Sequence, residues 1–485
     1  MRGARGLWTL AGVTVGLLMG SADAEHWAVI VAGSKGYWNY RHQADACHAY
    51  HVVRRHGIPA ENVVLMMYDD VAHSEENPFK GKLFNKPANV TSGEGPLEVY
   101  AGCHVDYRGE DVTPENFISV LLGDKKAVEG KKVLESGPDD RVFVNFVDHG
   151  ADGVVVFPDD QLLTAEKLTS TLQAMYEKKM YKELVFYVEA CESGSMFHDA
   201  DMAKINAFVT TAANATESSW GYYCPPMDII NGQPMNTCLG DLYSINWMQD
   251  SDRTDLSGET LRQQFQLVKT ETNLSHVKAF GAKHIRHEIV GNFQSNYDNA
   301  PSDDGSADSD YNASLERDVQ HQATPSHSNQ FGVAVDARDV NLVLAFYKYM
   351  RSERGASRKQ LAKALIREIE NRERADFLFE KIRGNTLHLN SAAYSSPSPN
   401  DVSACRTQTF KVFKEECSQT VEGEDGIGNG FTSYSLQYAR DLQRICTSFG
   451  DISAVREVLR QSCPKMTPQS RTRSIRHDHA DASLV

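Results

Sequence analysis

The sequence predicts an α/β unit followed by a separate all-helical unit. Residues 26–295 alternate short apolar, β-branched runs with stretches of helical spacing, and this predicts a mostly parallel sheet covered by helices on both faces. Residues 297–335 are rich in Asp, Ser, Asn, Gln and His and have no apolar period, so we expect an exposed linker there. After this stretch, helical spacing returns without a strand pattern. A chain of 485 residues exceeds what one hydrophobic core usually serves, which agrees with two units.

Each expected strand is a short apolar run, and each expected helix is a longer stretch with apolar residues every three or four positions. The expected strands are residues 27–32, 63–67, 142–147, 184–188 and 207–210. The expected helices are residues 43–56 and 165–179 in the first unit, and stretches within 340–383 and 404–463 in the second. We therefore divide the chain into a leader, an α/β domain, a linker, a helical unit and a disordered tail, at residues 1–24, 25–300, 301–335, 336–465 and 466–485.

The first 24 residues have the three parts of a secretory signal peptide. Arg2 and Arg5 form a basic start, residues 7–19 are apolar, and Ala22-Asp23-Ala24 has the small-x-small pattern that signal peptidase cleaves. The apolar run is too short to span a bilayer, and we expect no membrane span elsewhere. The mature chain should begin near Glu25 and follow the secretory pathway. Four triplets of the glycosylation type agree with that route, at Asn89, Asn214, Asn273 and Asn312.

Formal charge is divided unevenly between the two units. Residues 25–300 carry a net charge of −15, whereas residues 336–465 carry +3. The two units can therefore attract each other. The larger unit has no concentrated basic face, so we do not expect a nucleic-acid partner.

Six of the nine cysteines are expected to form disulfides in an oxidising compartment. Cys224 and Cys238 bracket a loop that contains three prolines, and we expect them to close it. The helical unit contains four cysteines, and the spacing alone allows three ways to pair them. They are Cys405, Cys417, Cys446 and Cys463.

The other three cysteines have different surroundings. Cys47 falls within a helix of apolar spacing, and we interpret it as a buried small hydrophobe. Cys103 has no evident role. Cys191 follows a predicted strand, where a reactive residue would be placed.

Two predicted strands end in residues that can carry out catalysis. Residues 142–147 run into Asp148-His149-Gly150, and residues 184–188 run into Glu189-Ala190-Cys191. Reactive groups of a parallel α/β sheet gather just past the carboxyl ends of its strands, so His149 and Cys191 should face one crevice if these strands are neighbours. Histidine is the usual partner that activates a thiol. The N–H groups of Gly150 and Cys191 could bind an oxyanion.

Each of these residues also has a simpler interpretation. A single histidine after a strand is usually a polar loop residue, and a single cysteine there usually packs. Their occurrence at two matching strand ends, each followed within three residues by a glycine, favours catalysis. A metal site is the weaker alternative, because no Cys/His group has zinc-site spacing, and no cofactor is expected.

Several segments, in order along residues 26–250, resemble the legumain family, also called asparaginyl endopeptidases or vacuolar processing enzymes. The longest are residues 39–50 (NYRHQADACHAY) and 189–195 (EACESGS), together with residues 67–70, 109–113, 148–150, 210–214 and 240–243. Such a string is far more specific than one short motif. The loop between Cys224 and Cys238 resembles the plant-type members more than the animal ones.

The resemblance implies a caspase-like fold for the first unit and a cysteine endopeptidase that cuts after asparagine through a thioester. It assigns the nucleophile to Cys191, the general base and acid to His149, and a supporting role to Asn39. It places the specificity pocket at Arg41, His42, Glu189, Ser219 and Asp241.

Three of these pocket residues suit an asparagine side chain. Arg41 can donate to the carboxamide oxygen, while Glu189 and Asp241 can accept from its NH₂ group. A buried site built to bind both ends of an amide rejects apolar side chains strongly. The alternative interpretation of these three residues is a structural ion cluster.

The helical unit resembles the family's C-terminal prodomain, which covers the active site until it is removed. The resemblance implies the disulfides Cys405–Cys446 and Cys417–Cys463. It also implies an enzyme that is secreted or works in a vacuole- or lysosome-like compartment. Members tend to have an asparagine at the start of the activation segment, where this chain has Asp336. We expect self-processing in acid, with cuts after Asn329 or Asp336. The expected partners are proteins and peptides with an exposed asparagine, and the chain's own prodomain as inhibitor.

Two other functions are compatible with parts of this pattern. The catalytic subunit of the lipid-anchor transamidase has the same plan of histidine and cysteine at strand ends, but it is membrane-tethered. A catalytically silent relative could serve as a binding or storage protein. Some legumain relatives also join peptides, and the residues quoted above do not decide between cutting and joining.

Overall fold

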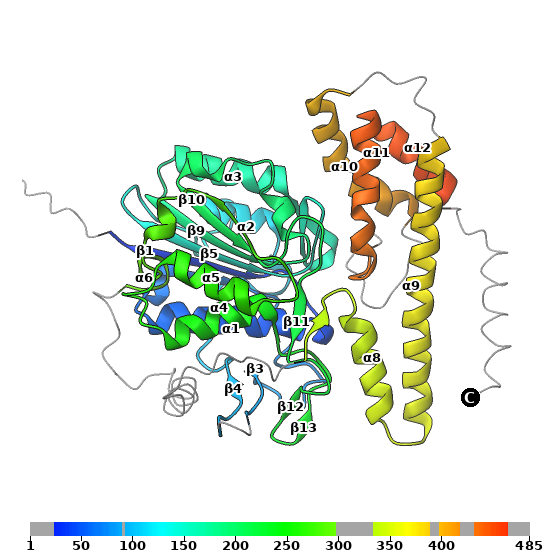
Figure 1. The fold of residues 1–485 in the computed structure, drawn as a ribbon, viewed down its shortest axis with the longest axis horizontal. Coiled ribbons are helices and arrows are strands. Elements are labelled where there is room, and N and C mark those ends of the chain that lie inside the picture. The colour runs from blue at the N-terminus through cyan, green and yellow to red at the C-terminus, as the bar shows by residue number, and fades with distance from the viewer. Residues whose placement is uncertain (1–23, 90–92, 297–332, 389–396, 418–430, 464–485) are drawn as a thin grey trace, which may run out of the picture.

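The computed structural model describes residues 24–89, 93–296, 333–388, 397–417 and 431–463. Within these residues, a six-stranded sheet with the order β15-β10-β9-β5-β1-β2 forms the centre of the larger unit (Figure 1). Neighbouring strands run parallel, except that β15 is antiparallel to β10. The strand bounds are β1 His26–Ala32, β2 Val63–Met66, β5 Arg141–Val147, β9 Glu183–Glu189, β10 Ala207–Thr211 and β15 Lys278–Gly281.

The predicted α/β class and its five strands are confirmed. The edge strand β15 is not among the predicted strands, because its residues Lys-Ala-Phe-Gly contain only a short apolar stretch. Its antiparallel pairing with β10 places it at the sheet edge, where a strand has a neighbour on one side only.

Alternate residues of each strand face opposite sides of the sheet, and each side has its own apolar core. In β1, Ala28 and Ile30 belong to one core, while Val29 and Val31 belong to the other. Helices α1 Tyr40–Arg55, α4 Leu242–Arg253, α5 Leu261–Glu271 and α6 Gly291–Gln294 cover the first side. Helices α2 Pro114–Leu121 and α3 Ala165–Glu177 cover the second. Figure 1 shows these two layers of helices with the sheet between them.

Short antiparallel ladders surround the carboxyl ends of the central strands. One contains β6 Gly150–Ala151, β7 Val154–Phe157 and β8 Gln161–Thr164. A second contains β14 Gly240–Asp241, β11 Trp220–Tyr222 and β16 Val335–Asp336. The pairs β3 Phe84–Lys86 with β4 Leu97–Glu98, and β12 Ile229–Ile230 with β13 Gln233–Pro234, lie in the connecting segments.

The second unit is helical in its described residues. It contains α8 Val340–Arg351, α9 Ala356–His388, α10 Pro399–Cys417, α11 Ala439–Phe449 and α12 Ile452–Ser462. Its apolar core includes Phe379, whose ring stacks on Phe413, Phe431 and Tyr438. None of the helices described combines the length and the apolar character that a bilayer crossing requires.

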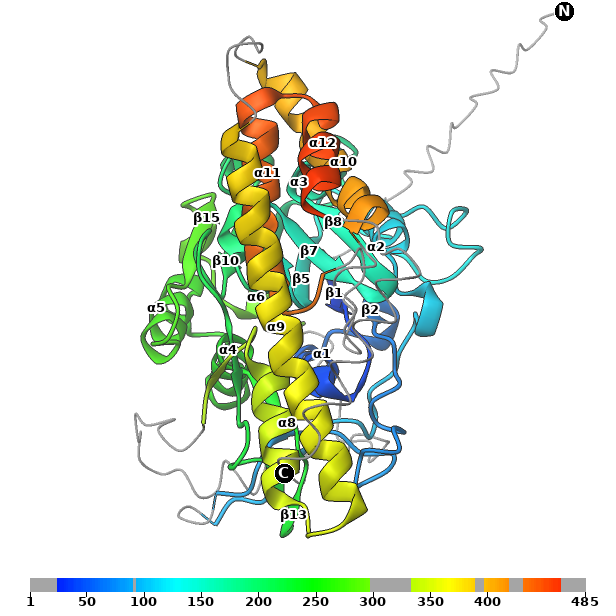
Figure 2. The same ribbon diagram turned by 90° about the vertical axis from the view of Figure 1, so that its right-hand side faces the viewer.

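The helical unit packs against the larger unit beside the strand ends. Ala151, Val154 and Val156 of the β6-β7-β8 ladder belong to the same apolar core as α11 and α12. Helix α9 runs the length of the unit on this side of the molecule (Figures 1 and 2). The catalytic end of the sheet is thus the face that the helical unit covers.

Four disulfides are formed, and one of them corrects the sequence interpretation. Cys224–Cys238, Cys405–Cys446 and Cys417–Cys463 pair as expected. Cys47, however, is bonded to Cys103 rather than packed as a free thiol. The segment after β4 folds back onto α1, where His104 contacts the ring of Tyr50, and no feature of the sequence indicates that approach. Cys191 is the free cysteine.

The end of the expected linker also differs from the prediction. Val335 is buried and forms β16 with Asp336, and this strand pairs antiparallel with β11. The polar composition of this stretch predicts exposure. A strand of two residues is too short to show an apolar period, so the sequence could not indicate this pairing. Residues 1–23, 297–332 and 464–485 lie outside the described residues, and with them the expected sites Asn312 and Asn329.

Candidate active site

The strand register brings His149 and Cys191 to the same end of the sheet. Strands β5 and β9 are adjacent and parallel, with Val147 opposite Glu189. His149 follows β5 by one residue after Asp148, and Cys191 follows β9 after Ala190. Both are buried, with 4% and 2% of their surface exposed. The two strand ends predicted to share a crevice are therefore neighbours.

Gly150 lies against the backbone of the nucleophile loop. A Cβ atom added at this position would lie 2.4 Å from the carbonyl oxygen of Cys191 and 3.0 Å from the Cβ of Ala190. Any larger residue would push the two strand ends apart. Glycine is thus required for the close approach that an oxyanion site made of the N–H groups of Gly150 and Cys191 needs.

The His149 ring is oriented by Asn39, as expected. Nε2 of His149 lies 2.8 Å from Oδ1 of Asn39, whose Nδ2 donates to the carbonyl oxygen of Lys35 at 3.0 Å. Because the Asn39 amide already uses its NH₂ group, its oxygen faces the ring and His149 donates from Nε2. Nδ1 is then the nitrogen that can accept a proton. Burial, followed by the charges of Arg41 and Arg338, holds the pKa of His149 well below its ordinary value, so the ring is neutral.

Cys191 lies beside the pocket residue Ser219. The Ser219 N–H donates to Sγ at 3.3 Å, and the Ser219 hydroxyl lies 3.7 Å from Sγ. Burial raises the pKa of the Cys191 thiol, partly offset by Arg338. The thiol is therefore protonated while the helical unit covers it, and its reactivity is low in this form.

The five expected pocket residues come together and are all buried. Nε of Arg41 contacts Oδ1 of Asp241 at 2.9 Å, and Oε2 of Glu189 accepts from both the N–H and the hydroxyl of Ser244 at 3.0 Å. Arg41, His42, Glu189 and Asp241 are each 1% exposed, and Ser219 is 3% exposed.

Three polar atoms of this pocket have no hydrogen-bond partner among the described residues. They are Nη2 of Arg41, Oε1 of Glu189 and Oδ2 of Asp241, which is 3.6 Å from Nε2 of His42. One donor and two acceptors is the complement of a carboxamide, which has one oxygen and two N–H groups. Buried polar atoms without partners are costly, so their presence together suits a pocket that is completed by a ligand.

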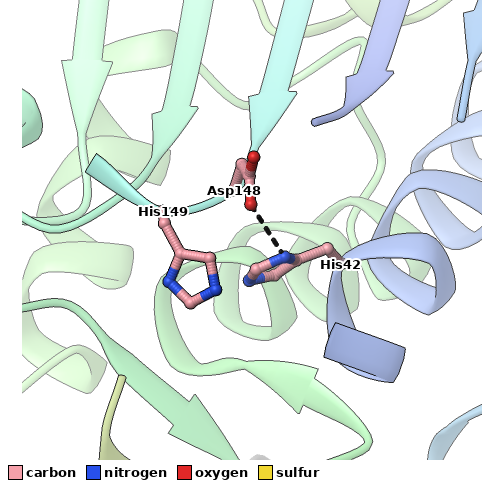
Figure 3. Close-up of side chains that lie close together, drawn as sticks. All are labelled: His42, Asp148 and His149. Carbon is pink, nitrogen blue, oxygen red and sulfur yellow. Dashed lines mark ion pairs between the residues drawn. The ribbon is translucent and has the colours of Figure 1, made fainter. Parts of the chain in front are cut away.

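His42 connects the pocket to the catalytic histidine. Nδ1 of His42 lies 2.6 Å from the Ser34 hydroxyl and 3.2 Å from Oδ1 of Asp148, and its ring meets that of His149 edge to face at 5.0 Å (Figure 3). The ligand atoms of His42, Asp148 and His149 lie within 4.8 Å of one another, a spacing that could hold a metal ion. One nitrogen of each ring is engaged with the protein, through Ser34 and Asp148 for His42 and through Asn39 for His149.

The segment after β16 crosses the active site. Val335 and Asp336 pair with Gly221 and Trp220, and the Ala337 N–H then donates to the carbonyl oxygen of Ser219 at 3.0 Å. Ala337 is thus bound to Ser219, the residue that contacts the sulfur of Cys191. Asp336, the expected processing site, lies one position earlier along the segment.

Two arginines of the helical unit hold Glu192, the residue after the nucleophile. Nη2 of Arg338 lies 2.6 Å from Oε1 of Glu192, and Nη2 of Arg440 lies 2.8 Å from Oε2. Arg440 also donates to the carbonyl oxygen of Ala215, and its Nη2 lies 3.6 Å from Asp152. Burial raises the pKa of Glu192 to about 7, and the two arginines act in the opposite direction.

These contacts include residues that the sequence analysis did not single out. Glu192 is adjacent to the predicted nucleophile, and the opposite charges of the two units indicated that ion pairs would join them. Neither signal selects Arg338 or Arg440 among the many arginines of the helical unit. Of the expected glycosylation sites that are described, Asn273 is exposed, while Asn89 and Asn214 are half-buried.

Comparison with known proteins agrees with this geometry. A model of the peptidase C13 family matches residues 26–296. The chain belongs to the peptidase C13 family. The C13 match covers the sheet, the two strand ends and the pocket, and it confirms the resemblance on which the caspase-like fold was expected.

Individual C13 relatives match in two ways. Legumain of Mus musculus is 52% identical over 286 residues, which are 58% of this chain and 62% of that protein. Legumain of Rattus norvegicus is 53% identical over 274 residues, which are 56% of this chain and 59% of that protein. These matches therefore span less than two thirds of the relatives' length. The vacuolar-processing enzyme of Vicia sativa is 36% identical over 460 residues, 91% of this chain and 86% of that protein. The plant match thus extends across the helical unit.

Proposed function

We propose that this chain is the proenzyme of a cysteine endopeptidase that hydrolyses the peptide bond on the carboxyl side of asparagine. The observation that carries the proposal is the set of three unpartnered atoms, one donor on Arg41 and two acceptors on Glu189 and Asp241, beside the free cysteine. The names of the C13 relatives, legumain and vacuolar-processing enzyme, support it.

The arrangement of side chains is suited to acyl transfer. Nδ1 of His149 takes the proton of the Cys191 thiol as the sulfur attacks the carbonyl carbon of the substrate asparagine. The N–H groups of Gly150 and Cys191 stabilise the oxyanion, and His149 returns its proton to the departing amine. Water, deprotonated by His149, then hydrolyses the thioester and restores the thiol. The steps use only groups of this chain and water.

The helical unit is proposed as the inhibitor of the same site. The 335–338 segment occupies the edge of β11 beside Ser219, where a substrate strand would pair, and Arg338 and Arg440 close over Glu192. A substrate cannot reach Cys191 while these contacts persist. Removal of the unit would also expose His149 and Cys191 to water and reduce the burial that suppresses thiolate formation.

The proposed location is an acidic vacuole- or lysosome-like compartment reached through the secretory pathway, or the extracellular space. The four disulfides support an oxidising route, and the expected leader and glycosylation triplets agree with it. The proposed partners are proteins and peptides with an accessible asparagine.

A matched set of peptides tests this function. The purified chain is matured in acid and incubated with peptides that differ at one position, which is Asn, Gln, Asp or Leu. We expect cleavage after Asn with kcat/KM at least about 100-fold above that for Leu, because a buried polar pocket rejects apolar side chains. The Cys191→Ser chain, checked for an unchanged circular dichroism spectrum, should be inactive. Equal cleavage of the Leu peptide would overturn the proposal.

A further inference from the structure

A buried carboxyl group lies directly behind the pocket and has no part in the mechanism above. Asp45 is on α1, one helical turn after Arg41, and its exposed fraction is 0%. Its Oδ1 accepts from Nδ2 of Asn85 at 2.7 Å, and its Oδ2 accepts from the backbone N–H of Asp241 at 3.0 Å. Asp45 therefore touches the backbone of a pocket residue without reaching the pocket itself.

The backbone before Asp241 is pressed against this carboxyl group. A Cβ atom at Gly240 would lie 2.8 Å from Oδ1 of Asp45 and 2.7 Å from the side chain of Ile245. Glycine at this position permits the approach. The position of Asp241 relative to Asp45 is thus fixed by contact on two sides.

A hydrogen-bonded chain on the far side fixes the orientation of Asn85. Nδ1 of His48 is 2.6 Å from Oδ1 of Asn85, and Nε2 of His48 is 2.8 Å from Oδ2 of Asp252. The Asn85 oxygen is therefore occupied by His48, and its NH₂ group donates to Asp45 and to the carbonyl oxygen of Leu239. Asp45 thus receives two neutral N–H donors and no cation from these partners.

The charges of the cluster require a proton on one carboxyl group. Asp45, Glu189 and Asp241 are all between 0% and 1% exposed, and the guanidinium of Arg41 contacts Asp241. Oδ2 of Asp45 lies 3.0 Å from the backbone nitrogen of Asp241, so the two carboxyl groups are close, and a charge on one disfavours a charge on the other. Asp241 has Arg41 as a partner at 2.9 Å, whereas Asp45 has neutral donors. We therefore place the proton on Asp45. In agreement with this assignment, burial and the neighbouring Asp241 raise the pKa of Asp45 well above its ordinary value.

We propose that Asp45 is a protonated positioning residue that donates its O–H to the Asp241 carboxylate and so keeps Asp241 ionised and oriented toward the substrate carboxamide. The inference rests on the pocket assignment of the proposed function. It adds a residue that determines specificity without contacting the substrate: Asp241 accepts from the asparagine NH₂ because Asp45 and Arg41 hold its charge and its position.

Infrared difference spectroscopy tests the protonation directly. The full-length proenzyme is compared with Asp45→Asn and with Asp252→Asn, a matched control that removes another buried carboxyl group of the same hydrogen-bonded chain. At neutral pH we expect the carbonyl stretching band of a protonated carboxyl group in the wild-type-minus-Asp45→Asn spectrum. The corresponding Asp252→Asn spectrum should lack it. A carboxylate band alone in the first spectrum would overturn the inference.

Kinetics of the matured enzymes test the positioning role. Rates are expressed per active site, counted by labelling of Cys191, so that incomplete maturation does not affect the comparison. We expect Asp45→Ala to raise KM for an Asn peptide by roughly tenfold or more, with kcat changed less than threefold, because the lost hydrogen bond orients the pocket and not the reacting atoms. Asp45→Asn keeps an N–H donor toward Asp241, so its KM should lie between that of Asp45→Ala and that of the wild-type enzyme.

The possible outcomes separate this inference from the proposed function. An Asp45→Ala enzyme with wild-type KM contradicts the positioning role while cleavage after Asn stands. A wild-type chain that shows the protonated band but does not cut after Asn contradicts the proposed function and leaves the protonation of Asp45 in place.

Discussion

In the proposed mechanism His149 is the base and Asn39 orients its ring through the hydrogen bond between them. Asn39 holds Nε2 of His149 at 2.8 Å and transfers no proton. We expect His149→Ala to lower kcat/KM by about 10²–10⁴, the range of a general base, and Asn39→Ala to lower it by less. Stopped peptide assays at one active-site concentration measure both. A loss in Asn39→Ala equal to that in His149→Ala would contradict the division of roles.

The pocket also predicts how the choice between asparagine and aspartate depends on pH. An aspartate side chain would enter a site that already contains Glu189 and Asp241, and like charges raise the pKa of the entering carboxyl group. The substrate aspartate is then bound in its protonated form, which resembles asparagine. We expect the ratio of kcat/KM for Asp to that for Asn to rise as the pH falls from 7 to 4.5. A ratio that stays constant over this range would contradict the pocket assignment.

At the residue scale, the sequence could predict groups that sit at recognisable positions. His149, Cys191 and Gly150 follow apolar runs, and Arg41, His42, Glu189, Ser219 and Asp241 were assigned by the resemblance. Cys47 was misinterpreted and Cys103 was given no role, because a disulfide depends on a loop approach that spacing does not encode. Asp45 was passed over because its importance comes from Asp241 and Asn85, which are distant in sequence.

At the scale of elements, the short strand β16 is the part of the proposed inhibitory segment that pairs with the candidate active site. Its pairing with β11 continues into the hydrogen bond between Ala337 and Ser219, so that a small side chain lies beside a pocket that is suited to asparagine. A segment bound in this way can inhibit without being cut, because alanine offers no carboxamide to the pocket.

Substitution of Ala337 tests this view of β16. In Ala337→Asn we expect the proenzyme to cut itself after residue 337, since the new side chain can bind Arg41, Glu189 and Asp241. Mass spectrometry of the new amino terminus, Arg338, would show the cut. Ala337→Leu is the control and should not create it. Absence of the Arg338 terminus in Ala337→Asn would show that the segment does not present residue 337 to the nucleophile.

The long strands and helices were predictable because their apolar periods extend over many residues. Strands β1, β5 and β9 are seven residues each and are buried along most of their length, which a continuous apolar run indicates. Strands β16 and β14 have two residues each, and their existence depends on the neighbouring strand β11. Tertiary pairing, not local propensity, forms these elements.

At the scale of the whole molecule, opposite charges join the two units, and Glu192 lies at their contact. Its pKa of about 7 is above the ordinary value of 4.5 for glutamate, mainly because of burial. A carboxyl group with a raised pKa contributes docking stability that is present at low pH and lost as the pH rises through 7. Asp336 also has a raised pKa, again mainly from burial. The raised pKa values of these two groups therefore do not account for the self-processing that we expect in acid.

The expected self-processing in acid must therefore depend on other groups. The net charge of −15 on residues 25–300 becomes less negative as the many exposed carboxylates are protonated, and the attraction to the +3 unit falls with it. Protonation of an aspartate at the cutting site would add to this effect.

Removal of Arg440 tests how far the ion pairs at Glu192 hold the helical unit. Arg440 is half-buried and pairs with the buried carboxyl group of Glu192, so Arg440→Ala should weaken docking and raise the activity of the unprocessed chain at neutral pH at least about tenfold. Arg444→Ala is the matched control on the same helix, because Arg444 is 68% exposed and pairs only with Asp441 on its own helix among the ion pairs described. Equal activity of the two variants would exclude Arg440 as a main contact.

Covalent labelling of the matured chain tests the central claim most directly, because it reports on the nucleophile and the pocket together. The chain is treated with a peptide that ends in an electrophile derived from asparagine, and the labelled residue is located by tandem mass spectrometry. We expect one label, on Cys191, with the corresponding leucine reagent reacting at least about 100-fold more slowly. A label on any other residue, or equal labelling by the leucine reagent, would contradict a Cys191 nucleophile served by an asparagine pocket.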